Sequence, residues 1–106
     1  MNNFSDMLSK AKAMQEKMKE AQEQIKKIEV EGSSGGDLVK IVLSGDYELK
    51  SIKISEAARK ESQEIVNDLI IAAYNNAKEN LKKKSAEELS KITGGLNLPL
   101  DFKLPL

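Results

Sequence analysis

The feature that most constrains the fold is an unbroken apolar seam in the first 28 residues. Its members recur at alternating intervals of three and four residues: Phe4, Met7, Ala11, Met14, Met18, Ala21, Ile25 and Ile28. A heptad spacing sustained over this length is typical of a helix that packs in coiled-coil fashion. The spacing predicts a helix over about residues 4–27, which would be roughly 35 Å long and would have one apolar edge to cover.

The apolar period changes from helical to alternating after residue 28. Two turn-forming stretches follow, at residues 32–37, which are rich in glycine and serine, and at Gly45-Asp46. The apolar residues that alternate between and beyond these turns are Val39, Ile41, Leu43, Ile52 and Ile54. Short period-2 segments joined by such turns predict a three-stranded antiparallel meander over about residues 28–54. A sheet of this kind has one polar face and one apolar face.

Apolar residues at helical spacing return from about residue 61 and predict a second helix over about residues 61–92. Gly94-Gly95 follows it as a helix stop. At ~1.5 Å per residue this helix would be roughly 45 Å long. The remaining segment, residues 94–106, alternates leucine or phenylalanine with other residues and contains Pro99 and Pro105. That pattern predicts an extended apolar tail that packs on the folded protein and does not form a central strand.

These segments together predict one α+β domain over residues 1–106, with a long N-terminal helix, a three-stranded antiparallel meander, a long C-terminal helix and an extended apolar tail. A compact domain of about 100 residues has a radius of gyration of only ~13 Å. Both helices must therefore project beyond so small a sheet. Because their apolar edges would face water unless a second chain covered them, the helix lengths predict a homodimer.

The composition argues against several kinds of chemistry. The chain has no cysteine and no histidine, which leaves out disulfides, thiolate metal sites and the usual nucleophile and general base. The glycine-rich stretch at residues 32–36 leads into a strand pattern, unlike a nucleotide-binding loop, which leads into a helix. We therefore expect no enzyme, no metal, no cofactor and no small-molecule substrate. The sequence shows no bilayer-length apolar run and no secretory leader, so a cytoplasmic protein without a membrane partner is expected.

Charge gives the clearest candidates for a binding surface. Seventeen basic and seventeen acidic side chains leave no net charge, which mildly disfavours a nucleic-acid partner. Free ammonium groups along a projecting helix nevertheless suit a phosphate backbone. The candidate DNA-binding residues are Lys10, Lys12, Lys17, Lys19, Lys82, Lys83 and Lys84. The alternative is a solubilising surface, because acidic residues lie three or four positions from several of these lysines.

The types of residue near the lysines limit how the protein could recognise DNA. Neither predicted helix contains an arginine, and no aromatic residue is interleaved with the lysines. Arginine is the usual reader of guanine, and aromatic rings are the usual platform for unstacked bases. Any DNA binding should therefore be dominated by the phosphate backbone and only weakly specific for sequence.

Four segments in order resemble the YbaB/EbfC family of bacterial nucleoid-associated proteins. They comprise residues 14–18, residues 30–41 with the Val-Glu-Gly and Gly-Asp-Leu-Val-Lys-Ile motifs, residues 68–77, and residues 94–105. The resemblance covers essentially the whole chain. It implies an intertwined homodimer whose long helices project and grip double-stranded DNA, a location in the cytoplasm and nucleoid, and no cofactor.

The resemblance also implies structural roles, in turns and in close packing of the second helix, for Gly32, Gly36, Leu69, Ala72, Ala73 and Ala77. A function of a different class remains open beside DNA binding. A dimeric, coiled-coil-like adaptor could use the same apolar seam, the tail or the predicted sheet to dock a protein partner. The sheet region is acidic, since residues 28–57 carry three lysines and six acidic side chains.

Overall fold

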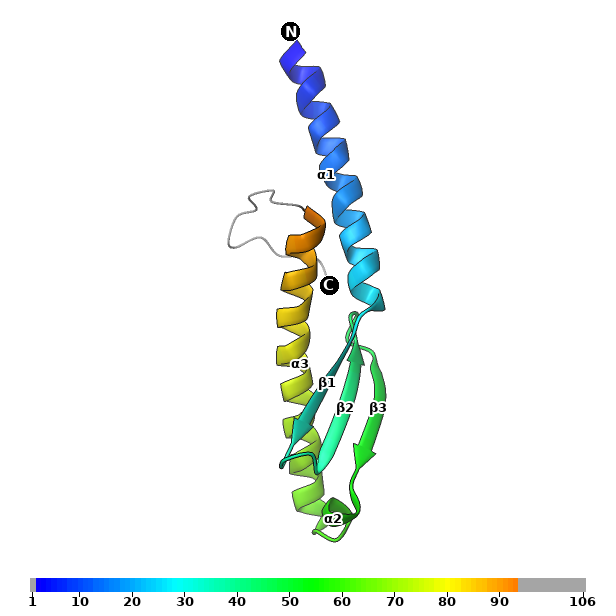
Figure 1. The fold of residues 1–106 in the computed structure, drawn as a ribbon, viewed down its shortest axis with the longest axis vertical. Helices are drawn as coiled ribbons and strands as arrows, with labels where there is room; N and C mark the ends of the chain where they lie inside the picture. Colours follow the sequence, from blue (N-terminus) through cyan, green and yellow to red (C-terminus); the bar gives the residue numbers. More distant parts are fainter. Residues whose placement is uncertain (1, 94–106) are drawn as a thin grey trace.

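The computed structural model describes residues 2–93 and shows an elongated molecule (Figure 1). The chain measures 72 × 22 × 18 Å, with a radius of gyration of 19.1 Å. Its elements are, in order, α1 (Asn2–Lys27), β1 (Glu29–Ser34), β2 (Val39–Ser44), β3 (Leu49–Ile54), α2 (Glu56–Arg59) and α3 (Gln63–Thr93). The predicted α+β architecture of two long helices and a three-stranded antiparallel meander is confirmed. The predicted apolar tail, residues 94–106, lies outside the described residues.

Two boundaries differ from the sequence prediction. Residues 32–34 were expected in a turn, but they belong to β1, and only residues 35–38 form the turn to β2. The second long helix begins at Gln63, two residues late, because Ser62 caps it: the Ser62 hydroxyl accepts a hydrogen bond from the Ile65 N–H at 3.3 Å. The short helix α2 precedes it. The hydroxyl of Ser55 caps α2 by accepting a hydrogen bond from the Ala58 N–H at 3.1 Å.

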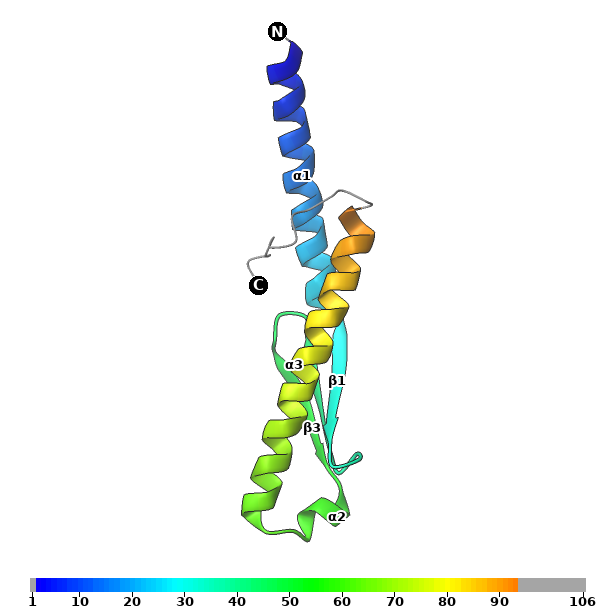
Figure 2. The same ribbon diagram turned by 90° about the vertical axis from the view of Figure 1, so that its left-hand side faces the viewer.

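The hydrophobic core lies between the sheet and α3, which crosses one face of the sheet (Figure 2). Val39, Ile41 and Leu43 alternate along the central strand β2, and each is at most 1% exposed. α3 contributes Ala73, Ala77 and Leu81 to one buried cluster with these residues of β2. Full burial of a valine, leucine or isoleucine contributes about 1.5–3 kcal/mol. The alternation in the sequence therefore identified the side of β2 that holds the fold together.

The closest approach of α3 to the sheet is at Gly32. A Cβ atom at this position would overlap backbone atoms of both Ala73 and Ala77. The implied close packing of the second helix is thus confirmed for Ala73 and Ala77, whereas Gly32, expected in a turn, lies in the strand that they contact. Ala72 lies about 100° around the helix from Ala73, is exposed, and takes no part in this contact.

α3 covers the sheet unevenly. It packs on β1 and β2 and hardly touches β3. Ile52 pairs with the buried Ile41 and so projects from the same face of the sheet, yet it is 43% exposed. Leu49, also on β3, is 46% exposed. The part of the apolar face that belongs to β3 is therefore left open within the described chain.

α1 has two differently packed parts. Its C-terminal turns pack against α3, and Ala21 and Ile25 are fully buried there. Residues 2–19, here called the arm, extend beyond the sheet and the end of α3 (Figures 1 and 2). In the arm Phe4, Met7 and Leu8 are 69%, 66% and 49% exposed. The predicted seam is thus covered by the chain's own α3 at one end and open at the other.

Candidate nucleic-acid interface

The four α1 lysines predicted to bind DNA all lie on the arm. Lys10, Lys12, Lys17 and Lys19 are exposed, and none takes part in the ion pairs found among residues 2–93. An exposed ammonium group that has no ion-pair partner in the chain can pair with an anionic ligand without first breaking another ion pair. These side chains are therefore free, with respect to the described chain, to meet an anionic surface.

The arm lysines form two rows. Lys10 and Lys17 are seven residues apart and lie beside the apolar seam, where they line a shallow hollow with Ala13 and Met14. Lys12 and Lys19 form the second row, which the ~100° rotation per helical residue places about 160° around the helix from the first. The two rows flank the arm. A single phosphate strand cannot contact both equally.

The second predicted group, Lys82, Lys83 and Lys84 on α3, has different surroundings. Lys84 Nζ lies 3.7 Å from Glu88 Oε1, and the same carboxylate oxygen pairs with Lys91 at 3.6 Å. Lys82 and Lys83 are exposed. The structure does not bring this group together with the arm lysines, because it lies beside the sheet and the arm extends past the end of α3 (Figure 1).

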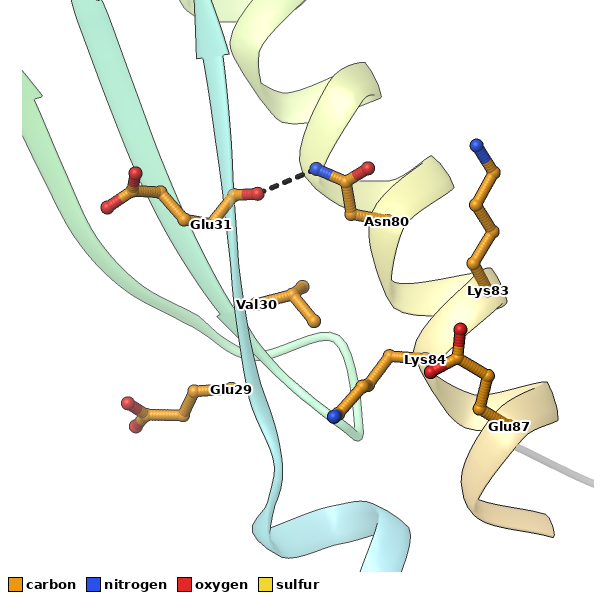
Figure 3. Close-up of a pocket in the computed structure, with 7 residues that line it drawn as sticks. All are labelled: Glu29, Val30, Glu31, Asn80, Lys83, Lys84 and Glu87. Carbon is orange, nitrogen blue, oxygen red and sulfur yellow. Dashed lines mark hydrogen bonds between the residues drawn. The ribbon is translucent and has the colours of Figure 1, made fainter. Parts of the chain in front are cut away.

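Carboxylates surround part of the α3 group. A groove between α3 and the edge of β1 is lined by Glu29, Val30, Glu31, Asn80, Lys83, Lys84 and Glu87 (Figure 3). Exposed ion pairs are worth only about 0–1 kcal/mol each, so none of these lysines is locked in place. Glu87 in this groove and Glu88, which pairs with Lys84, nevertheless lower the positive potential that a phosphate would meet there, whereas the side chains of Glu29 and Glu31 point away from α3 (Figure 3). The arm is therefore the more favourable anion-binding surface of the two.

A carboxyl group with a lowered pKa lies away from both groups of lysines. Asp46, in the turn between β2 and β3, accepts a hydrogen bond from the Ser44 hydroxyl, and this bond lowers the pKa of its carboxyl group. The Ser44 hydroxyl oxygen also accepts from the Glu48 N–H at 3.1 Å. This network orders the turn and takes no part in the candidate interface.

Sequence reasoning overlooked two asparagines of α3 that contact β1. Asn76 Oδ1 accepts a hydrogen bond from the Ser33 N–H at 2.9 Å, and Asn80 Nδ2 donates to the Glu31 carbonyl oxygen at 2.8 Å. Their spacing of four residues, on either side of the buried Ala77, was the available signal. It was uninformative without the position of β1, which the sequence alone does not give.

Within the described residues, neither long helix contains a stretch both long enough and apolar enough to cross a bilayer. The same residues hold no group of three or more acidic side chains arranged to bind a metal ion.

Comparison with known proteins places the chain among bacterial relatives of similar length. A sequence model of the YbaB/EbfC DNA-binding family matches residues 1–96. The chain is 42% identical to a nucleoid-associated protein of Bartonella bacilliformis, over 99% of this chain and 98% of that protein. It is 41% identical to a nucleoid-associated protein of Agrobacterium fabrum and 45% identical to one of Brucella anthropi, with 99% of both chains covered in each case.

Proposed function

The chain belongs to the YbaB/EbfC DNA-binding family, and from this premise we propose that it is a non-enzymatic, nucleoid-associated protein that binds double-stranded DNA mainly through the phosphate backbone. The principal contacts are Lys10, Lys12, Lys17 and Lys19 of the arm. Lys82, Lys83 and Lys84 of α3 contribute less, because carboxylates lie beside them. Its location is the cytoplasm and nucleoid, and its effect on chromosome organisation and gene expression follows from occupancy of DNA.

One observation carries this proposal. The arm presents four exposed lysines that have no ion-pair partner among the described residues. Each phosphate neutralised by a lysine releases condensed counterions, so affinity falls with salt by a slope of about 0.9 per contact. Four contacts predict a slope near 3.6, which is a loss of about 10²-fold between about 50 mM and about 200 mM salt.

We further propose that the binding unit is a homodimer, as the resemblance implies. Leu49 and Ile52 on β3 are nearly half exposed on the apolar face of the sheet, and Ile54, Ile70 and Tyr74 beside the core are only partly buried. Monomeric proteins seldom leave a contiguous apolar surface of this kind in water. A second copy that covers β3 would bury it and would present two arms to one duplex.

The test is a fluorescence-anisotropy titration of a short labelled duplex with the purified full chain at several salt concentrations. Steep salt dependence with little preference among duplex sequences is the expected result. Absence of binding even at about 50 mM salt would remove DNA binding from consideration. Sedimentation of the same sample measures the mass of the free protein, and a stable, folded single copy at micromolar concentration would contradict the homodimer.

The exposed apolar side chains of the arm favour a second candidate function. Phe4, Met7 and Leu8 are uncovered within the described chain, and they are what a dimeric adaptor would use to dock the helix of a protein partner. Capture of a partner that survives nuclease treatment, and that is lost in Phe4→Ser/Met7→Ser, would favour the adaptor. Insensitivity of that capture to charge reversal at the arm lysines would separate it from DNA binding.

A further inference from the structure

The two edges of the sheet differ in their contact with α3. The strand order is β1-β2-β3, so β1 and β3 are the edges. α3 packs along β1 and hardly touches β3. An edge strand presents unpaired N–H and C=O groups to which a strand of another chain can bond. The packing of α3 on β1 therefore determines which edge of the sheet can pair with a strand of another chain.

The register shows which β1 groups face outward. The Gly45 N–H donates to the Ile28 carbonyl oxygen, and inward and outward groups alternate along an antiparallel strand. Val30 and Gly32 thus direct their backbone groups toward β2, whereas Glu31 and Ser33 direct theirs outward. Glu29 is directed outward as well; of these three residues, Glu31 and Ser33 are each bonded to α3 through one backbone group.

Two asparagine side chains make these bonds. The Ser33 N–H donates to Asn76 Oδ1 at 2.9 Å, and Asn80 Nδ2 donates to the Glu31 carbonyl oxygen at 2.8 Å (Figure 3 shows the second bond). One amide supplies an acceptor and the other a donor, as an additional strand would. A strand that approached β1 would have to displace both.

Gly32 allows the side chains of Asn76 and Asn80 to reach the backbone of β1. It lies between Glu31 and Ser33, and its lack of a side chain lets the backbone of β1 approach that of α3 at Ala73 and Ala77. Beyond Asn80, toward the start of β1, the helix and strand separate and the groove opens. Lys83, Lys84 and Glu87 line it there, and charged side chains at an edge also disfavour pairing with another strand.

We propose that Asn76 and Asn80 close the β1 edge to strand addition, so that a second copy of the chain cannot extend the sheet there and assembly stops at a finite size. The described part of β3 has no comparable cover. A sheet with one closed edge can pair once and then has no edge left, whereas a sheet with two open edges can add copies without limit. This inference stands whether or not the protein binds DNA.

The decisive variant is Asn76→Ala/Asn80→Ala, compared with Asn75→Ala. Asn75 is an exposed asparagine on the same helix, so it matches the change in side chain without touching β1. Sedimentation and light scattering across a concentration series should show the native chain and Asn75→Ala reaching a constant mass. The double variant should continue to grow in mass as its concentration rises. A double variant that is folded by circular dichroism and keeps the native mass throughout would overturn the proposal.

Amide hydrogen exchange gives a readout that does not require the double variant to fold. In the native chain the Ser33 amide should be protected although it points out of an edge strand. Protection should fall about tenfold or more in Asn76→Ala and should persist in Asn76→Asp, because a carboxylate still accepts the bond. A native Ser33 amide that exchanges like an unstructured peptide, or equal loss in both variants, would show that Asn76 does not close the edge.

Discussion

The arm and the remainder of the molecule, residues 20–93, contain similar residue types and use them in opposite ways. Ile41 and Leu43 of β2 and Leu81 of α3 are fully buried, whereas Phe4, Met7 and Leu8 of the arm are mostly or half exposed. Lysines differ likewise: Lys84 shares Glu88 with a neighbour, and the arm lysines have no ion pair in the described chain. Stability is therefore held in residues 20–93, and the surface that we propose for DNA binding lies on the arm.

The same truncation in the two regions should give the largest contrast. Leu43→Ala removes a fully buried side chain at the centre of the core and should lower the free energy of unfolding by about 3 kcal/mol. Leu8→Ala removes a half-exposed side chain of the arm and should change it by less than about 0.5 kcal/mol. Urea unfolding of both variants measures the difference. A large loss in Leu8→Ala would mean that the arm is packed in the native assembly.

Charge reversal should show the opposite contrast. Replacing Lys10, Lys12, Lys17 and Lys19 with glutamate should weaken DNA binding by about 10²-fold, or about 2.7 kcal/mol, and should flatten its salt dependence. Unfolding by urea should be almost unchanged, because these side chains are exposed. Anisotropy titrations at several salt concentrations provide the measurement.

Two double variants with the same net charge test whether the position of the lysines matters. Lys12→Glu/Lys19→Glu and Lys82→Glu/Lys83→Glu change the charge equally, but only the first alters the arm. The arm pair should lose at least about tenfold in affinity, and the α3 pair less than about threefold. Equal losses would show that net charge, and not position, determines binding. Comparing the first pair with Lys10→Glu/Lys17→Glu then identifies the side of α1 that faces the duplex.

The contact between α3 and β1 gives the next largest effect. Gly32→Ala places a Cβ against the backbone of Ala73 and Ala77, where nothing flexible can yield, and should cost about 2 kcal/mol. Gly36→Ala meets no atom, although its φ of +61° is unfavourable for alanine, and should cost about 1 kcal/mol. The urea concentrations at the unfolding midpoints of the two variants show which substitution destabilises the protein more. The reverse order would mean that α3 shifts away from β1 with little loss.

The sequence was most informative where structure depends on local periodicity. The heptad seam predicted α1 to within two residues, and the alternation of Val39, Ile41 and Leu43 predicted the buried side of β2. The assignment of Gly32 to a turn failed, since glycine and serine are typical of turns unless a helix passes close by. Ala73 and Ala77, the residues of that helix that contact Gly32, are more than 40 residues away in the sequence, so local pattern gave no sign of them.

The candidate site shows the same limit. Exposure of Lys10 and Lys19 followed from their heptad positions on one helix. The groove beside Lys83 and Lys84 has β1 as its other wall, and the partners of Asn76 and Asn80 come from the same strand. Contacts between elements depend on how the helix lies across the sheet. Hydrophobic periodicity specifies which face packs, but not which polar side chains then meet.

The smallest effect is expected in the turn between β2 and β3, where α1 joins the sheet: Gly45 packs against the Ile25 carbonyl of α1. The pKa of Asp46 is lowered, first by the hydrogen bond from the Ser44 hydroxyl. A carboxylate with a lowered folded-state pKa stabilises the fold above its unfolded pKa of 3.8 and loses that contribution as the pH falls through the folded value. Asp46→Asn should therefore be slightly less stable than the native chain at neutral pH and equally stable in strong acid.

Ser44→Ala serves as the partner in a double-mutant cycle, and Asp46→Asn should have almost no further effect in that background. A difference between native and Asp46→Asn that stays constant from neutral to acid pH would show that the bond to Ser44 does not order this junction.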